Sequence, residues 1–288
     1  MPRLHRRTDG GEATPEQIVS AAQQAGCRSI AYTYTEPTVF FDYALDISRL
    51  AHRVGLANIF VTNGYMTTEM LDMFGSYLDA ANVDLKAFCE RTYRRYVGAR
   101  LQPVLDSMLA MKQRGIWLEV TTLVIPGLND DPAELRDAAT FVAQELGADT
   151  PWHISRFFPG YRMMDRPPTP VKTLQQAQEI GRTAGLHHVY LGNLPGEANT
   201  SCHLCGQTVI RRHGYYVVEN RIESGRCPFC QALIAGVAMG HARKAACAMS
   251  FERNTYPWSQ KRGNYAGNTS HSATRGTEAR VRPWQPRF

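Results

Sequence analysis

The sequence predicts an α/β fold that contains a (β/α)6-type barrel or partial barrel, followed by a small four-cysteine module. Strand-like and helix-like segments alternate six times between residues 14 and 195, at the spacing of parallel β-α-β units. The strand-like segments are rich in β-branched and aromatic residues and lack clean alternation, as expected when both faces of a sheet are covered. Two Cys-x-x-Cys pairs then lie close together after residue 200. A barrel fits this pattern better than an open sheet.

The first element is a helix that begins after Thr14. The run Thr14-Pro15-Glu16-Gln17 supplies an N-cap, a proline at the first helical position and a glutamine three residues after the cap. The expected strands cover residues 29–34, 58–62, 80–85, 117–124, 152–157 and 188–191. The expected helices between them cover residues 39–54, 67–74, 90–96, 103–114, 132–146 and 174–184. A short β-like stretch at 215–219 lies between the two cysteine pairs.

Composition suggests how the chain is divided. Hydrophobic residues make up 43% of the 288 residues, enough for a sizeable core. The net charge of +6 is uneven, because residues 241–288 hold nine basic and two acidic residues. We expect a loose arm at 1–13, the barrel at 14–195, the module at 200–237 and a disordered basic tail at 241–288. With no run of about 18 apolar residues and no secretory signal, we expect a cytoplasmic protein.

The four-cysteine segment predicts a metal site. Cys202 and Cys205 form the first pair, 21 residues intervene, and Cys227 and Cys230 form the second. Two such turns can direct four thiolates at one ion, which is typical of structural Zn²⁺ sites. The other interpretation is a decayed site with two unpaired thiol pairs. If an ion is bound, it would stabilise a segment too short to fold alone.

Polar residues gather where the expected strands end. In parallel α/β folds, ligands bind outside the carboxyl ends of the strands. Each group also has an ordinary structural explanation: a turn at Asn63, an ion pair between Asp84 and Lys86, a helix cap at Glu36 and a core histidine at His153. Their collection at one mouth of the fold favours a binding site. The stretches concerned are residues 33–37, 62–65, 82–86, 124–130, 153–160 and 191–193.

Several of these stretches resemble one known family. Residues 31–38 (AYTYTEPT), 61–65 (VTNGY) and 83–88 (VDLKAF) resemble radical S-adenosylmethionine (SAM) enzymes. The resemblance is closest to relatives of pyruvate formate-lyase activating enzyme, specifically the radical SAM enzymes of the AmmeMemoRadiSam system. It continues in residues 123–130 (LVIPGLND) and 152–159 (WHISRFFP), and extends from about residue 14 to residue 237, including the cysteine pairs.

The resemblance implies a cofactor pair and a set of site residues. In such enzymes a [4Fe–4S] cluster held by three thiolates chelates SAM, and electron transfer releases a 5′-deoxyadenosyl radical that abstracts hydrogen from the substrate. By resemblance, Thr35 and Glu36 receive the methionine amino group. The other implied residues are Asn63, Asp84 and Lys86 around the methionine and ribose, Ile125 and Gly127 near the adenine, and His153 and Arg156 facing the reaction chamber.

One family feature is missing from the sequence. The family's Cys-x-x-x-Cys-x-x-Cys cluster motif follows the first barrel strand, and no such triplet occurs here. That strand and loop are expected before Thr14, where thirteen residues stand and none is a cysteine. The resemblance therefore implies a barrel without its first strand, and we expect the chain as given to be inactive because it cannot hold the cluster. A mis-called start or a truncation is favoured over a degenerate protein, since the pocket residues are intact.

Three functions remain open at this point. The first is a radical SAM enzyme, or its truncated remains, acting on a protein glycyl site or with a partner of the same system. The second is a zinc-ribbon nucleic-acid-binding protein that uses the module and the basic tail. The third is a non-catalytic member of an assembly. Nucleic-acid binding is the weaker interpretation, because the module carries only four arginines: Arg211, Arg212, Arg221 and Arg226.

Overall fold

The computed structural model describes residues 12–196, 198–214, 216–237 and 239. All of these belong to one compact unit, Met1–Ala242. Most of the expected N-terminal arm, and the expected basic tail, lie outside the described residues. No described helix is both long enough and apolar enough to cross a membrane.

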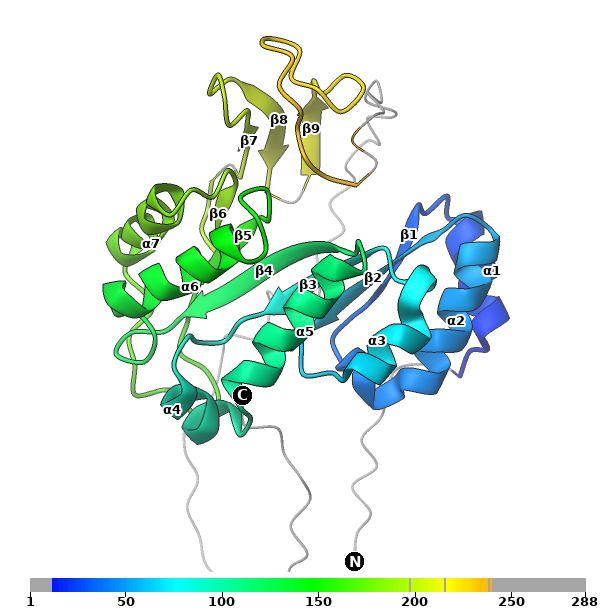
Figure 1. Ribbon diagram of the computed structural model, residues 1–288, viewed down its shortest axis with the longest axis horizontal. Helices are drawn as coiled ribbons and strands as arrows, with labels where there is room; N and C mark the ends of the chain where they lie inside the picture. Colours follow the sequence, from blue (N-terminus) through cyan, green and yellow to red (C-terminus); the bar gives the residue numbers. More distant parts are fainter. Residues whose placement is uncertain (1–11, 197, 215, 238, 240–288) are drawn as a thin grey trace, which may run out of the picture. The chain divides into compact units, whose positions relative to one another are not determined.

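The main sheet has six strands, all parallel and in sequence order (Figure 1). After each strand the chain therefore crosses back to the starting edge of the sheet through a segment that contains a helix. This is the topology of a partial β/α barrel. This confirms the α/β prediction. The strands are β1 (Ser29–Tyr32), β2 (Ala57–Thr62), β3 (Ala80–Asp84), β4 (Trp117–Val124), β5 (Trp152–Arg156) and β6 (Val189–Gly192).

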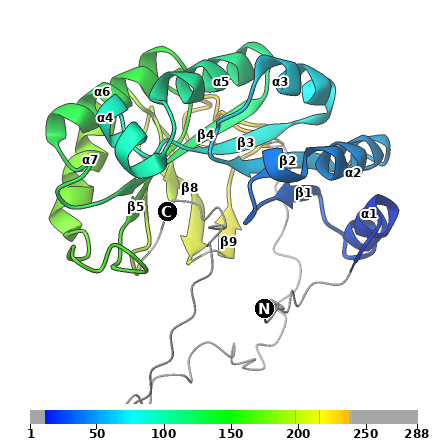
Figure 2. The same cartoon turned by 90° about the horizontal axis from the view of Figure 1, so that it is seen from below.

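The helices form an arc outside the curved sheet (Figure 2). The first one begins as its sequence predicts, because Thr14 and Gln17 exchange side-chain to backbone hydrogen bonds of 2.8 and 3.3 Å. The helices are α1 (Pro15–Gln24), α2 (Phe41–Arg53), α3 (Thr68–Phe74), α4 (Glu90–Thr92), α5 (Leu101–Gln113), α6 (Pro132–Gln144) and α7 (Val171–Thr183), with short 3-10 helices at Pro37–Phe40 and Gly75–Tyr77.

The two faces of the sheet differ in burial, and here the sequence-based expectation was wrong. In β4, Leu118, Val120 and Val124 are fully buried against the helices, whereas Glu119 and Thr121 on the other face are half-buried. Burial therefore alternates along β2, β3 and β4, although the less buried face is polar in β4 and apolar in β2. The reason is that only the outer face packs against helices. No described helix packs on the concave face.

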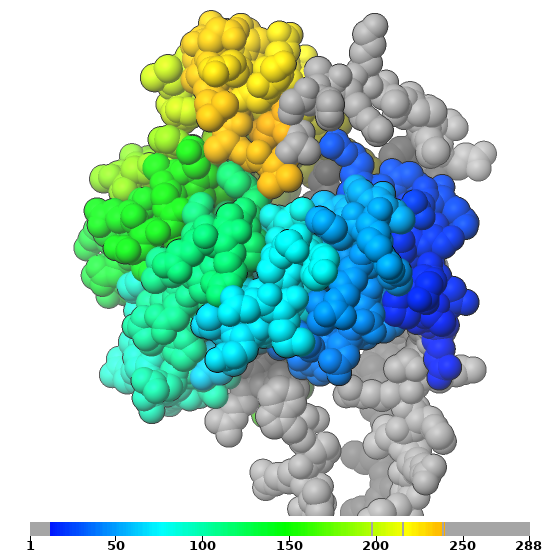
Figure 3. All heavy atoms as spheres, turned by 45° about the vertical axis from the view of Figure 1, so that its right-hand side comes forward, coloured from blue at the N-terminus to red at the C-terminus, as the bar shows by residue number. Residues whose placement is uncertain are grey.

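The four-cysteine segment forms a separate three-stranded antiparallel sheet in the order β7-β8-β9. Its strands are β7 (Thr200–Ser201), β8 (Thr208–His213) and β9 (Tyr216–Asn220). Only β9 was expected from the sequence. The module has its own small core, to which Val209, Ile222 and Ile234 contribute. It lies against the barrel (Figure 3, yellow and orange beside green and cyan), where the rings of His187 and His203 stack 4.1 Å apart.

Candidate functional site

The loop after β1 is tied to the end of β2 through Glu36. One carboxylate oxygen accepts a hydrogen bond from the hydroxyl of Thr62 at 2.6 Å, and the other accepts one from the backbone N–H of Asn63 at 2.7 Å. The side chain of Asn63 turns back to accept the N–H of Tyr65 at 2.7 Å. Two of the predicted cofactor residues, Glu36 and Asn63, are thus in direct contact. Thr35, the third of this group, is exposed beside them.

Gly64 fixes the position of this turn. Its φ of +71° lies in the left-handed region, and a Cβ atom here would come within 2.6 Å of Val83 and 3.2 Å of Val104. The buried hydroxyl of Ser107 donates to the carbonyl of Gly64 at 2.5 Å. The end of β2 therefore packs its backbone directly on β3 and α5, which sets where Asn63 stands.

The end of β3 carries a second pair of predicted residues. Asp84 and Lys86 form an ion pair with 2.5 Å between carboxylate and ammonium, and each side chain is about one-third exposed. Positions two apart on a strand share a face, as the sequence predicted. The backbone N–H of Lys86 donates to the hydroxyl of Tyr93 at 3.1 Å. Thr62 and Val83 are paired in the sheet, so this ion pair lies on the strand next to Asn63.

Asn129 connects the ends of β3 and β4, a role that sequence analysis missed. Its side chain is 1% exposed and satisfies three backbone groups. The amide oxygen accepts the N–H of Ile125 at 2.7 Å, and the amide nitrogen donates to the carbonyls of Lys86 and Leu123 at 2.8 and 2.9 Å. The predicted residues Lys86 and Ile125 are thus held together by one buried amide. An asparagine within the run LND was the only available signal.

Gly127 lies in the turn that follows. Its N–H donates to the carboxylate of Asp130 at 2.8 Å, and its φ is +67°. The guanidinium of Arg166 lies 3.2 Å from where a Cβ atom of Gly127 would stand, and it also donates to the carbonyl of Pro126 at 2.5 Å. The turn therefore places Gly127, an exposed residue without a side chain, at this edge of the sheet, held by hydrogen bonds of its own and neighbouring backbone groups.

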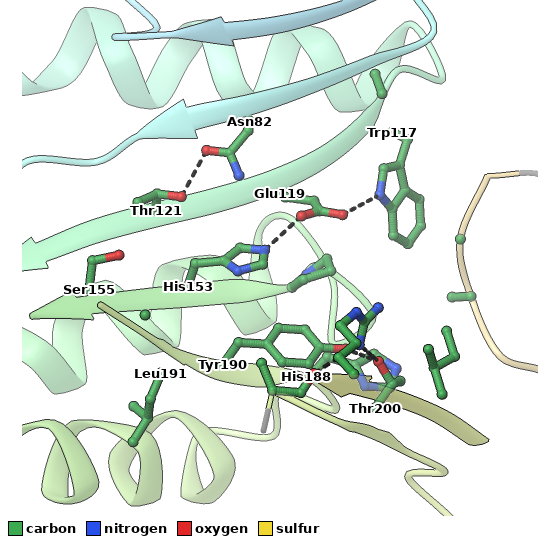
Figure 4. Close-up of a pocket in the computed structure, with 18 of the residues that line it drawn as sticks. Asn82, Trp117, Glu119, Thr121, His153, Ser155, His188, Tyr190, Leu191 and Thr200 are labelled. Atoms are coloured by element: carbon green, nitrogen blue, oxygen red, sulfur yellow. Dashed lines mark hydrogen bonds and ion pairs between the residues drawn. The ribbon is translucent and has the colours of Figure 1, made fainter. Parts of the chain in front are cut away.

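The two residues predicted to face a reaction chamber point to opposite sides of β5. His153 lies on the concave face, where its Nε2 is 2.6 Å from Glu119 and its ring stacks on Tyr190 with centroids 5.2 Å apart (Figure 4). It lines a cavity of about 940 Å³. Arg156 is outside the described lining of that cavity, and its Nε donates to the carbonyl of Thr169 at 2.8 Å.

The four cysteines come together at one point. Their Sγ atoms all lie within 4.8 Å of one another, with Cys202 to Cys230 at 3.6 Å and Cys205 to Cys227 at 3.7 Å. A tetrahedron of sulfurs around an ion at about 2.3 Å has edges of about 3.8 Å, so these thiols form a group that could hold a metal ion.

One thiol of this group is also predisposed to ionise. Burial opposes ionisation of Cys202, but hydrogen bonds from the backbone N–H groups of Cys205 and Leu204 prevail and lower its pKa to about 7. The thiolate, which is the metal-binding form, is therefore accessible near neutral pH.

Comparisons with known proteins identify the family. Residues 2–139 match the family model of the Radical SAM superfamily. An uncharacterized protein of Methanocaldococcus jannaschii is 41% identical over 223 residues, which are 76% of this chain and 66% of that protein. The chain belongs to the radical SAM superfamily. It spans just under two thirds of the length of that relative.

The fold is shared with a solved structure, and a second solved structure is similar at a lower TM-score. Streptococcus suis SuiB bound to S-adenosylmethionine has a TM-score of 0.52 and 12% identity, over 65% of this chain and 45% of SuiB. A domain of pyruvate-formate lyase-activating enzyme from Bacteroides vulgatus has a TM-score of 0.49 and 17% identity, over 57% of this chain and 99% of that domain.

Membership implies SAM and a [4Fe–4S] cluster as cofactors of the family. For SAM, the donor set fits: carboxylates, an ammonium, amides and exposed backbone stand at consecutive strand ends. For the cluster, the described barrel residues do not supply three thiolates. Within the part of the chain that the structure describes, the four cysteines of the module are the only group of three or more ligands within reach of one ion, whereas Cys27 is exposed and Cys89 half-buried elsewhere.

Proposed function

We propose that this chain binds S-adenosylmethionine at the carboxyl edge of its sheet, as a radical SAM protein of the AmmeMemoRadiSam type related to pyruvate formate-lyase activating enzymes. One observation carries the proposal: Glu36 and Asn63 are hydrogen-bonded to each other at the end of β2, beside the Asp84–Lys86 pair at the end of β3. Ligands of parallel α/β folds bind at this edge. Family membership supplies the identity of the ligand.

The chemistry of each group suits one part of SAM. The Glu36 carboxylate, with Thr35 beside it, complements the methionine ammonium, and the Lys86 ammonium complements the methionine carboxylate. Asp84 and Asn63 offer acceptors and donors to the ribose hydroxyls. When bound and reduced, SAM supplies the 5′-deoxyadenosyl radical of the family. The backbone around Ile125 and Gly127 would face the adenine.

The proposal for this chain is binding rather than SAM cleavage, because the printed sequence contains no Cys-x-x-x-Cys-x-x-Cys motif. Anaerobic reconstitution with iron and sulfide tests this part. In the Cys205→Ser variant we expect no cluster absorbance near 400 nm, since the described thiols outside the module do not form a triplet. A barrel-bound [4Fe–4S] spectrum in that variant would overturn it.

Calorimetric titration of the purified chain with SAM tests the binding proposal. Glu36→Gln keeps the shape but removes the charge, and we expect affinity to fall about 10- to 100-fold, as for a lost charge-assisted hydrogen bond. Glu179→Gln, an exposed glutamate on α7 whose nearest guanidinium is 3.9 Å away, is the matched control and should bind like the parent. Failure of the parent to bind SAM, or equal binding by Glu36→Gln, would refute the assignment.

For the module we propose a structural Zn²⁺ ion held by Cys202, Cys205, Cys227 and Cys230. Four thiolates in a tetrahedron select Zn²⁺ or iron, and all four positions are filled by protein, so the ion is not open to substrate. Elemental analysis of purified protein should give one zinc per chain, lost in Cys205→Ser. One iron per chain instead would replace zinc in this assignment.

The partner of the proposed enzyme stays a prediction. Streptococcus suis SuiB has been solved bound to its precursor peptide SuiA, which makes a protein or peptide substrate one candidate for this chain too. No observation among the described residues supports nucleic-acid binding. Such a function would also leave the polar residues on the concave face of the sheet without a role.

A further inference from the structure

A cavity lies on the concave face of the sheet, beside the edge proposed for SAM. The cavity of about 940 Å³ is lined by residues of β2 to β6 and by the four-cysteine module, and its lining extends to Ser155 and Gly192 near the carboxyl ends of β5 and β6. Glu119 pairs with Asn82 in the sheet, and Thr121 pairs with Asp84. Glu119 is therefore two residues, about 6.6 Å along the strand direction, toward the amino end from the level of Asp84. None of the residues proposed to hold SAM lines this cavity.

One wall presents a fixed carboxylate. Glu119 accepts the indole N–H of Trp117 at 3.3 Å and lies 2.6 Å from Nε2 of His153 (Figure 4). Burial opposes its ionisation, but these hydrogen bonds and the charge of His153 keep the pKa of Glu119 below its usual value. The side chain is still 35% exposed. A carboxylate held on both sides is a preorganised acceptor for a cationic group or an N–H donor.

The module supplies a cation to the opposite wall. One terminal nitrogen of Arg212, on β8, donates to the carbonyl of Ala198 at 2.9 Å and to the hydroxyl of Thr200 at 2.8 Å. Thr200 in turn bonds the hydroxyl of Tyr190 at 2.8 Å. The ring of Tyr190 stands between the two walls, 5.2 Å from the His153 ring and 6.0 Å from the Arg212 guanidinium carbon. The opposite charges are thus held several ångström apart.

His188 adds an unsatisfied polar atom. It lines the cavity and is only 6% exposed, yet among the described residues nothing hydrogen-bonds its Nε2. Burial, reinforced by neighbouring His187, lowers the pKa of His188, so the ring is neutral and Nε2 offers one hydrogen bond. A buried polar atom without a partner costs about 1–3 kcal/mol. Nε2 is itself closed to solvent-sized molecules, so this cost belongs to the wall of the cavity and not to a ligand.

We propose that this cavity binds an extended zwitterion, with its ammonium at Glu119 and its carboxylate at Arg212. The Tyr190 ring stands between the two charged groups, so a ligand whose ammonium and carboxylate are separated by a chain fits better than one in which they are adjacent. The cavity suits a short peptide with free ends, or an amino acid with its amine on a long side chain. The binding requires neither SAM nor a cluster to be present.

Calorimetry on the full chain, without SAM, tests the proposal with two probes. Triglycine represents a peptide and lysine represents a long-chain amino acid, and at least one should bind. If triglycine binds, N-acetyl-triglycine and triglycine amide each lack one charged end and should bind about tenfold more weakly or worse. If lysine binds instead, norleucine and cadaverine make the same comparison.

Variants assign each end of the probe. In Glu119→Gln, probes with a free and with a blocked amine should bind with equal affinity. In Arg212→Gln, probes with a free and with a blocked carboxylate should do so, as coupling in a double-mutant cycle requires. Arg211→Gln is the matched control, because Arg211 is the neighbouring residue of β8 but pairs with Glu219 instead. The proposal fails if neither probe binds, if blocked and free probes bind alike, or if Arg211→Gln has the effect expected of Arg212→Gln.

Discussion

Replacing Gly64 by alanine should destabilise the fold by a predictable sum of two effects. At φ +71° any side chain carries a left-handed penalty of about 1–2 kcal/mol. The new Cβ would also stand 2.6 Å from Val83 and 3.2 Å from Val104, both buried, so β2 or its neighbours must move, at about 1–3 kcal/mol. We expect Gly64→Ala to lower the free energy of unfolding by about 2–5 kcal/mol.

Gly55→Ala separates the two effects. Gly55 has φ +75° but nothing within 4 Å of the added Cβ, so it carries the left-handed penalty alone. The gain from a less flexible unfolded chain is the same in both variants and cancels. Urea unfolding followed by far-UV circular dichroism should therefore place Gly64→Ala about 1–3 kcal/mol below Gly55→Ala. Equal free energies for the two variants would show that β2 does not pack its backbone on β3 and α5 as described.

Three further predictions concern the core and the module. Asn129→Ala leaves three backbone groups unsatisfied, and urea unfolding should show a loss of roughly 3 kcal/mol or more. Burial raises the pKa values of Tyr32 and Tyr93 to about 12. The unfolded chain therefore loses these protons first, and stability present below about pH 10 falls as pH rises toward 12, by roughly 3 kcal/mol per tyrosine; Tyr93→Phe should make this fall shallower in urea titrations. Chelation of the metal should abolish hydrogen-exchange protection in residues 200–237 but not in the strands of the main sheet.

Most of the main fold was predictable because its signals are local. The capping residue Thr14, the prolines at the starts of α1 and α6, and the β-branched runs of the strands each specify their element without long-range information. All six strands of the barrel sheet were expected near their observed positions. The helix expected at 90–96 is instead one turn of α-helix followed by a π-helical turn, Tyr93–Val97. The hydroxyl of Tyr93 caps the N–H of Lys86, a tertiary contact that no local pattern shows.

The predicted site residues fall into two groups that sequence alone did not separate. Glu36, Asn63, Asp84 and Lys86 stand at neighbouring strand ends, as their positions after each expected strand indicated, whereas the roles predicted for them come from the family resemblance. The partners of His153 were missed because each is unremarkable in its own segment. Glu119, for example, sits in a strand that was interpreted as covered on both faces. Strand β8 was also missed, because only the stretch at 215–219 was interpreted as β-like in this module.

The alternation that was overlooked also indicates how this fold would hold the two proposed ligands at once. On β3 and just after it, residues 82, 84 and 86 share the concave face of the sheet. Asn82 lines the cavity of about 940 Å³, whereas Asp84 and Lys86 lie at the carboxyl edge. Each step of two residues advances about 6.6 Å. The strand therefore presents polar groups to two sites that are about 6.6 Å apart. Two molecules bound at these sites would be close enough for their nearest groups to touch. A ligand held at Glu119 would thus lie next to SAM held at Asp84, and binding of one should alter the calorimetric affinity for the other.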